Sequence, residues 1–280
     1  MRLLAVPAFE DNYIWALVDD DGDALVIDPG DAAPVLAATG NGLWPAAVLI
    51  THHHPDHAGG VPALRERWPT LPVFAPADDR VPDATERVGA GDTVRLKNWR
   101  LSVLEVHGHT RSHIAFHGGG SEGPPHLFCG DTLFSLGCGR LFEGTPAQML
   151  DALDRLASLP SESLVCCGHE YTLANGVFAQ AVDPHNRALQ RRIEDVHAMR
   201  QAGRPSLPVT LASEIATNPF LRVDTDPVRD AVAHRLGRAP VGRVGPVALQ
   251  RLVELVDDGL RRALGRGQAD PGRRLEVAQP

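Results

Sequence analysis

Four histidines and an aspartate fall within residues 51–57, which read THHHPDH. Imidazole nitrogens combined with carboxylate oxygens suit zinc, iron or manganese, whereas calcium and magnesium prefer oxygen ligands. Side chains alternate in an extended segment, so His52 and His54 are expected on one side and His53 on the other. His52 and His54 are therefore candidate metal ligands, and His53 is expected to be a structural or surface residue.

The second half of this segment offers a different pair of ligands. Pro55 turns the chain, so the side chains of Asp56 and His57 are expected to point in a different direction from those of His52 and His54. Two sets of ligands from one loop predict two metal ions. A zinc-bound water has a pKa of about 7, against ~15.7 in bulk water, so such a site would hold a nucleophile at neutral pH. The predicted chemistry is hydrolysis.

Three further residues of the same ligand types come later in the chain. His109, Asp131 and His169 each follow the end of an apolar run that predicts a strand. Binding groups gather beyond the carboxyl ends of strands in open sheets, so these residues are expected to meet the residues of the 51–57 segment at one edge. Asp56 and Asp131 would partly neutralise two divalent ions and leave a positive charge that favours a carbonyl oxygen.

The elements that position these residues change in character near residue 172. Before it, apolar runs alternate with loops rich in Gly, Pro and Asp, and beyond it the pattern is helical. Thr145 is the expected N-cap of one helix, with Pro146 at its first position. The predicted strands are 3–6, 14–18, 24–27, 47–50, 101–106, 126–129 and 164–167, and the predicted helices are 61–68, 146–158, 184–202 and 246–264. An α/β domain over residues 1–172 and a helical domain over 173–280 are therefore predicted, with a tail low in structure from about residue 265.

Composition narrows the range of partners. The 280 residues carry 27 Lys and Arg against 35 Asp and Glu, a formal charge of −8, which argues against a nucleic-acid-binding surface. No apolar run approaches a membrane span, so no membrane partner is expected. The four cysteines form no C-x-x-C pair, which indicates reduced thiols and a cytoplasmic protein. A monomer is expected.

Several ordered motifs resemble one known family. THHHPDH is similar to the histidine and aspartate signature of the metallo-β-lactamase superfamily, and GHT at 108–110, GDTLF at 130–134 and CGHEYT at 167–172 resemble a narrower group, the glyoxalase II or hydroxyacylglutathione hydrolase family. VPAFEDNYIWAL, IDPGDA, GCGRLFEGT and NPFLR extend the resemblance to about residue 260. The family fold is an αββα sandwich followed by a smaller helical domain, which agrees with the change near residue 172.

The resemblance implies a binuclear metal site with a role for each ligand. Two divalent ions are expected, with zinc favoured and iron or manganese as alternatives. The implied activity is attack of a metal-bridging hydroxide, oriented by Asp56, on the thioester of S-(2-hydroxyacyl)glutathione, such as S-D-lactoylglutathione. The products would be a 2-hydroxy acid and glutathione, in methylglyoxal detoxification. The implied ligands are His52, His54 and His109 for one ion, Asp56, His57 and His169 for the other, and Asp131 as the bridge.

The substrate side departs from the family pattern. Arg140 stands where lysine is usual, Tyr171 keeps the usual tyrosine, and Phe142 replaces another tyrosine and so lacks a hydroxyl. These three residues are the implied substrate contacts. Val253 and Val256 stand where the family commonly has basic residues for a glutathione carboxylate. Candidate substitutes nearby are Arg251, Arg261 and Arg262.

Residues around the predicted ligands have open roles. His113 is expected either to hydrogen-bond to a metal-binding residue or to be a core histidine, and Asp28 either to brace the metal-binding loop or to form a simple turn. Cys166 and Cys167 are expected to be small core residues.

Other functions remain open at this point. The persulfide dioxygenase relatives are oxidoreductases that bind one iron and act on glutathione persulfide, but they generally lack a C-terminal helical domain. A metallohydrolase of another thioester and a non-catalytic scaffold with the same fold are further alternatives.

Overall fold

Two mixed β-sheets form the centre of the computed structural model, which describes residues 1–81, 83–121, 123–236 and 252. The first sheet has the order β1-β2-β3-β4-β5-β6, with β1 (Arg2–Ala8), β2 (Asn12–Val18), β3 (Asp23–Ile27), β4 (Trp44–Leu49), β5 (Val73–Ala75) and β6 (Glu86–Arg87). The second has the order β14-β13-β10-β9-β8-β7, with β7 (Thr93–Leu96), β8 (Trp99–Glu105), β9 (Ile114–Gly119), β10 (His126–Gly130), β13 (Leu164–Cys167) and β14 (Val209–Thr210). A separate hairpin joins β11 (Leu133–Phe134) to β12 (Gly137–Cys138).

Burial explains how the two sheets pack. On β8, Trp99, Leu101 and Val103 are buried while the residues between them are exposed, so only one face of this strand enters the core. All of β2 is buried because both of its faces are covered. Trp15 belongs to the core cluster shared with β8, and Ile14 belongs to a second cluster on the other face.

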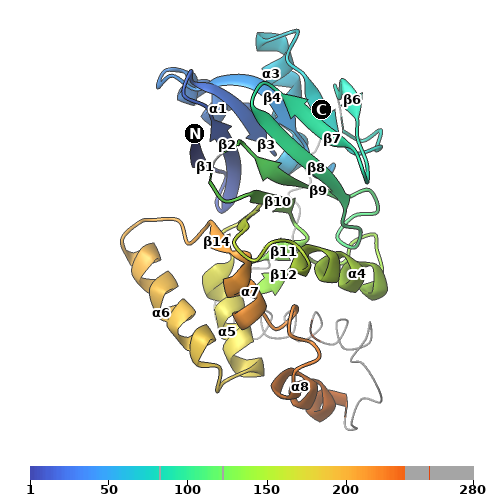
Figure 1. The fold of residues 1–280 in the computed structure, drawn as a ribbon, viewed down its shortest axis with the longest axis vertical. Coiled ribbons are helices and arrows are strands. Elements are labelled where there is room, and N and C mark those ends of the chain that lie inside the picture. Colours follow the sequence, from blue (N-terminus) through green and yellow to red (C-terminus); the bar gives the residue numbers. More distant parts are fainter. Residues whose placement is uncertain (82, 122, 237–251, 253–280) are drawn as a thin grey trace, which may run out of the picture.

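Helices cover the outer faces of the sheets. The second cluster, which contains Ile14, includes residues of α1 (Ala32–Thr39) and α3 (Val61–Arg67). Residues of α4 (Pro146–Ala157) belong to the cluster that contains Trp15 and the buried residues of β8. Thr145 caps α4 through a reciprocal pair of hydrogen bonds with Gln148, as its sequence predicts. The αββα sandwich predicted from the motifs is confirmed (Figure 1).

Beyond residue 172 the described chain is helical except for one strand. α5 (Thr172–Val182), α6 (Arg187–Gln201), α7 (Leu211–Thr217) and α8 (Asp226–Leu236) gather at one end of the molecule (Figure 1). β14 pairs antiparallel with β13, so this region also adds an edge strand to the second sheet. The predicted helix 246–264 and the tail from about 265 lie outside the described residues, and the division at residue 172 stays a prediction.

Two expectations from composition can be compared with the structure. The four cysteines are free, and Cys166 and Cys167 are buried in the core as predicted. Among the described helices, none combines the length and apolar character needed to cross a bilayer.

Candidate metal centre

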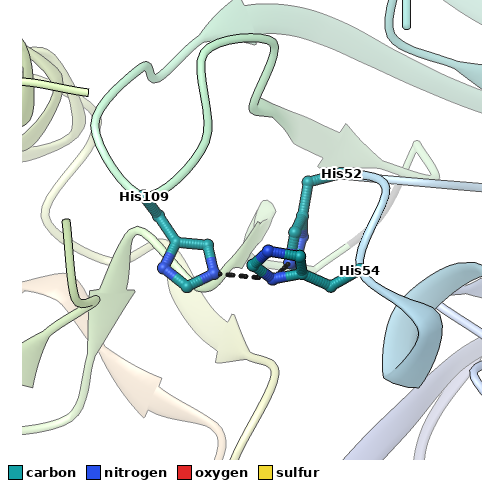
Figure 2. Close-up of side chains that lie close together, drawn as sticks. All are labelled: His52, His54 and His109. Atoms are coloured by element: carbon teal, nitrogen blue, oxygen red, sulfur yellow. Dashed lines mark hydrogen bonds between the residues drawn. The ribbon is translucent and has the colours of Figure 1, made fainter. Parts of the chain in front are cut away.

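Three histidines predicted to share an ion converge from two loops. His52 and His54 follow β4, and His109 lies between β8 and β9. The Nδ1 atom of His54 lies 3.1 Å from Nε2 of His52 and 3.1 Å from Nε2 of His109 (Figure 2). Nitrogens bound to tetrahedral zinc at about 2.0–2.1 Å would be roughly 3.3 Å apart, so this spacing fits a metal ion.

Asp56, His57 and His169 form a second group. Asp56 and His57 lie on the short helix α2 (Pro55–Ala58), and His169 follows β13. The Nε2 atoms of the two histidines are 3.3 Å apart, and Oδ2 of Asp56 lies 3.5 Å from Nε2 of His169 and 3.6 Å from Nε2 of His57. In each group the three potential ligand atoms lie within 4.8 Å of one another.

Asp131 lies between the two groups. Its Oδ2 atom is 3.5 Å from Nε2 of His109 and 3.3 Å from Nε2 of His169, and its Oδ1 atom is 3.3 Å from Nε2 of His57. Oδ1 is buried and has no hydrogen-bond donor among the described residues. Gly168 leaves room here, because a Cβ atom would lie 2.6 Å from both Oδ1 of Asp131 and Cε1 of His57. A buried acceptor surrounded by imidazoles fits a site for cations.

The ring nitrogens that face away from the centre have their own partners. Such a partner fixes the tautomer of a histidine and presents its other nitrogen to a metal. Four of the five histidines in the two groups share this arrangement. The pairs are His52 Nδ1 with Thr51 Oγ1 (3.0 Å), His57 Nδ1 with Asp28 Oδ2 (3.0 Å), His109 Nδ1 with the Arg140 carbonyl (2.8 Å) and His169 Nδ1 with Asp11 Oδ1 (2.8 Å).

Asp28 braces the loop that carries the first histidines. Its carboxylate accepts hydrogen bonds from the backbone N–H and the hydroxyl of Thr51, both at 2.7 Å, besides its contact with His57. The backbone of Asp28 is left-handed, at a φ of 53°, a conformation that aspartate adopts more readily than most residues. A Cβ atom at Gly30 would lie 1.9 Å from the carbonyl oxygen of Asp56, so this turn packs directly on α2. Of the two roles left open for Asp28, the structure supports bracing.

His113 and His53 have opposite relations to the centre. His113 is buried, stacks on His52 with ring centroids 4.5 Å apart, and accepts a hydrogen bond at Nε2 from the backbone N–H of Asp131. It therefore supports both a candidate ligand and the backbone of another. His53 faces away, as its sequence position predicts, and its Nδ1 atom lies 3.5 Å from Oδ2 of Asp78.

The electrostatic environments of the two groups differ. Burial lowers the pKa of His52 well below its usual range, and burial together with the nearby His109 lowers the pKa of His54 to about 4. Burial also acts to lower the pKa of His169, but the charge of Asp131 and a hydrogen bond to Asp11 raise it to about 9. At neutral pH His52 and His54 are therefore neutral and can bind a cation directly, whereas His169 must first release a proton.

This difference predicts how the metal-free protein responds to pH. A folded pKa of about 9 for His169, against 6.5 when unfolded, stabilises the metal-free fold by on the order of 3 kcal/mol below pH 6.5. That contribution is lost as pH rises through about 9, and His57, whose pKa Asp131 raises against the effect of burial, acts in the same direction. The melting temperature of metal-free protein should therefore fall between pH 6.5 and 9. A His169→Gln variant should lose the part of this dependence that His169 contributes, and a melting temperature of the parent that rises over this interval would contradict the assignment.

The implied substrate contacts lie around the centre. Tyr171 stacks on His169, with ring centroids 4.7 Å apart and an interplanar angle of 8°. Phe142 is 62% exposed, and its ring centroid lies 5.2 Å from that of His109. Arg140 is exposed, and its carbonyl holds His109. Their role in substrate binding stays a prediction, and the following residues lie outside the described part of the chain: Arg251, Val253, Val256, Arg261 and Arg262.

Two residues at the centre were not singled out from the sequence. Asn12 donates a hydrogen bond from Nδ2 to Oδ2 of Asp56 at 3.1 Å, and Asp11 holds His169. Asn12 is 7% exposed at the first position of the buried strand β2. A polar pair at the start of an otherwise apolar strand was the available signal.

Two family models together match most of the chain. Residues 12–169 match the metallo-beta-lactamase superfamily, and residues 170–244 match the hydroxyacylglutathione hydrolase C-terminus. A hydroxyacylglutathione hydrolase of Xanthomonas axonopodis pv. citri (strain 306) is 61% identical over 240 residues, which cover 85% of this chain and 92% of that protein.

Solved structures show the same fold. ETHE1 from Myxococcus xanthus has a TM-score of 0.61 and 25% identity over 96% of this chain and all of that one. TTHA1623, solved in a di-iron-bound form, has a TM-score of 0.55 and 26% identity over 79% of this chain and all of that one. Through both family models and its curated relative, the chain belongs to the hydroxyacylglutathione hydrolase, or glyoxalase II, family of the metallo-β-lactamase superfamily.

Proposed function

We propose that the protein hydrolyses S-(2-hydroxyacyl)glutathione thioesters, such as S-D-lactoylglutathione, to a 2-hydroxy acid and glutathione, in methylglyoxal detoxification. The observation that carries this proposal is the position of the Asp131 carboxylate, within 3.5 Å of histidines from both ligand groups. A second support is the name of the curated relative, a hydroxyacylglutathione hydrolase.

The proposal assigns the potential ligands to two divalent ions. Zinc fits the imidazole-rich ligand set, and iron is supported by the di-iron-bound form of the structural relative TTHA1623, with manganese as a further alternative. When bound, the ions supply a nucleophile at neutral pH and positive charge that stabilises the oxyanion. The assignment is His52, His54, His109 and Asp131 for one ion, and Asp56, His57, His169 and Asp131 for the other.

Asp56 is proposed to orient the nucleophile. Its side chain is 40% exposed, unlike the other candidate carboxylate, and Nδ2 of Asn12 holds its Oδ2 atom. Burial acts to raise the pKa of Asp56, but the charge of His57 and the hydrogen bond from Asn12 lower it, so the group stays an acceptor at neutral pH. Asp56 can therefore accept a hydrogen bond from a proton-bearing group at the open side of the centre.

Three residues around the centre are proposed to bind glutathione. Arg140 can donate charge-assisted hydrogen bonds to a carboxylate, and the rings of Tyr171 and Phe142 offer surfaces for the peptide. The leaving thiol has a pKa near 8.5, so the thiolate departs without a strong general acid. These residues are therefore needed to orient the substrate more than to transfer a proton.

A direct assay tests the proposal. Zinc-loaded protein should hydrolyse S-D-lactoylglutathione, measured as loss of thioester absorbance, and prior removal of the metal with a chelator should abolish the activity. The matched control is S-D-lactoyl-coenzyme A, which carries the same acyl group and should be a poorer substrate. Absence of turnover in protein that holds two ions per chain would refute the proposal.

The oxidoreductase alternative is not favoured. Residues 170–244 match the hydroxyacylglutathione hydrolase C-terminus, and the described part of this region is a set of helices with one strand. Oxygen consumption with glutathione persulfide measures that alternative in the same preparation, and none is expected.

A further inference from the structure

A buried carboxylate beside the metal centre is held by the C-terminal region. Glu170, between His169 and Tyr171, has a side chain that is 8% exposed. It accepts hydrogen bonds from the hydroxyl of Tyr13 at 2.8 Å and from the backbone N–H of Ser206 at 2.8 Å, as well as from the Ser206 hydroxyl. The chain that follows β13 is therefore fixed to a residue some 36 positions further along.

A second buried carboxylate lies on α7 and holds the turn between β11 and β12. Glu214 on α7 is fully buried and accepts hydrogen bonds from the hydroxyl of Ser135 at 2.7 Å and the backbone N–H of Leu136 at 2.9 Å. Asn218 donates from Nδ2 to Glu214 and to carbonyl oxygens of β11 and β12. Leu136 is left-handed, at a φ of 61°, so the turn between β11 and β12 keeps an uncommon shape inside this set of contacts.

Arg192 on α6 joins these two carboxylate clusters. Its Nη2 atom donates to the carbonyl of Ser206 at 2.9 Å and to the hydroxyl of Ser135 at 3.3 Å. Arg192 is only 8% exposed, and the negative charges of Glu214 and Glu170 both act on it. One guanidinium thus connects the residue after His169 with the hairpin of β11 and β12.

That hairpin leads directly to the metal centre. β11 begins two residues after Asp131, and the backbone N–H of Gly139, just after β12, donates to the carbonyl of Thr132 at 3.1 Å. The next carbonyl, that of Arg140, accepts the hydrogen bond from His109. A shift of the hairpin would therefore move Asp131, and a shift of Glu170 would move His169. Metal–ligand distances tolerate only about 0.2 Å.

We infer that Arg192 is a positioning residue which, through Ser206 and Ser135, fixes the placement of His169 relative to Asp131. The C-terminal region thereby sets the metal affinity of the Asp56, His57 and His169 group, a role beyond contact with substrate. The inference rests on the two-ion assignment proposed above.

Zinc affinity measured without substrate tests the inference. Metal-free full-length Arg192→Met and Ser206→Ala variants are titrated with zinc against a chromophoric chelator. Arg191→Met is the matched control, because Arg191 is the exposed neighbour on the same helix. The expected result is about tenfold weaker binding of the ion assigned to Asp56, His57 and His169, as for loss of a ligand-supporting group, with a smaller loss for the other ion, which shares Asp131. kcat should fall while KM for the thioester changes little.

Three results would overturn the inference. The first is an Arg192→Met variant that binds both ions as tightly as the parent. The second is an equal loss of affinity for both ions that follows the loss of melting temperature. The third is uptake of a single ion by the parent. The milder Ser206→Ala variant, which removes one hydroxyl, decides the matter if Arg192→Met does not fold, since parental zinc binding there would also refute the role. A parent that binds two ions without hydrolysing thioester would refute only the proposed substrate.

Discussion

An Asp131→Ala variant is expected to lose both bound ions and to hydrolyse thioester at least about a thousandfold more slowly, equivalent to roughly 4 kcal/mol of transition-state stabilisation. The reason is charge and position together. Asp131 is the only carboxylate among the described residues whose oxygens lie within 3.5 Å of His57, His109 and His169. Without it, Asp56 would be the only carboxylate left in the two ligand groups, and the repulsion between two divalent ions would be less compensated.

Metal analysis and kinetics on matched variants measure this effect. Asp131→Asn keeps the size of the side chain and removes its charge, so it should bind metal more weakly than the parent but better than alanine. Asp151→Ala removes an exposed carboxylate on α4 and should leave zinc content and kcat unchanged. Two ions per chain in Asp131→Ala would show that the aspartate does not bridge.

Removal of the Asp28 carboxylate is expected to have the second largest effect. In Asp28→Ala, His57 Nδ1 and the backbone N–H of Thr51 lose their acceptor in a buried site, which costs about 1–3 kcal/mol of the free energy of unfolding for each unsatisfied group. Zinc affinity should fall by about 10–100-fold, because the tautomer of His57 is no longer fixed. Alanine also fits the left-handed backbone of this position poorly.

Two controls separate metal affinity from stability. Asp28→Asn accepts the same left-handed conformation and can accept one hydrogen bond, so it should fall between the parent and alanine. Asp31→Ala removes the N-cap of α1 and should lower the melting temperature without changing zinc affinity. Calorimetry and chelator competition provide the two readouts. Undiminished zinc affinity in Asp28→Ala would mean that Asp28 does not orient His57.

The sequence predicts long apolar strands well because burial acts on consecutive residues. β13 was predicted with its observed bounds, Leu164–Cys167, and the predicted strand 14–18 lies within β2. β5 and β6 have three and two residues, too few for a periodic pattern, and both were missed. The six-residue β9 (IAFHGG) was also missed, because its apolar run covers only its first three residues. β4 begins at Trp44, earlier than expected, because Pro45 follows this residue and interrupts the pattern that predicts a strand.

The candidate centre was predictable where ligand types cluster and unpredictable where a single contact defines the role. The motif residues signal themselves through chemistry and spacing, and the structure brings all seven together. Asn12 and Arg192 give no such signal. Asn12 meets Asp56 across 44 positions and Arg192 meets Ser135 across 57, so only the folded chain shows their partners.

The edge strand β14 determines which backbone groups the second sheet leaves open to strand addition. β13 would otherwise be the last strand of the second sheet, with a free row of backbone donors and acceptors open to strand addition by another molecule. β14 covers that row with a pairing of two residues, Val165 with Val209 and Leu164 with Thr210. The two family models meet between residues 169 and 170, yet the sheet continues across that boundary. A cut there would divide one hydrogen-bonded sheet and leave a template for aggregation.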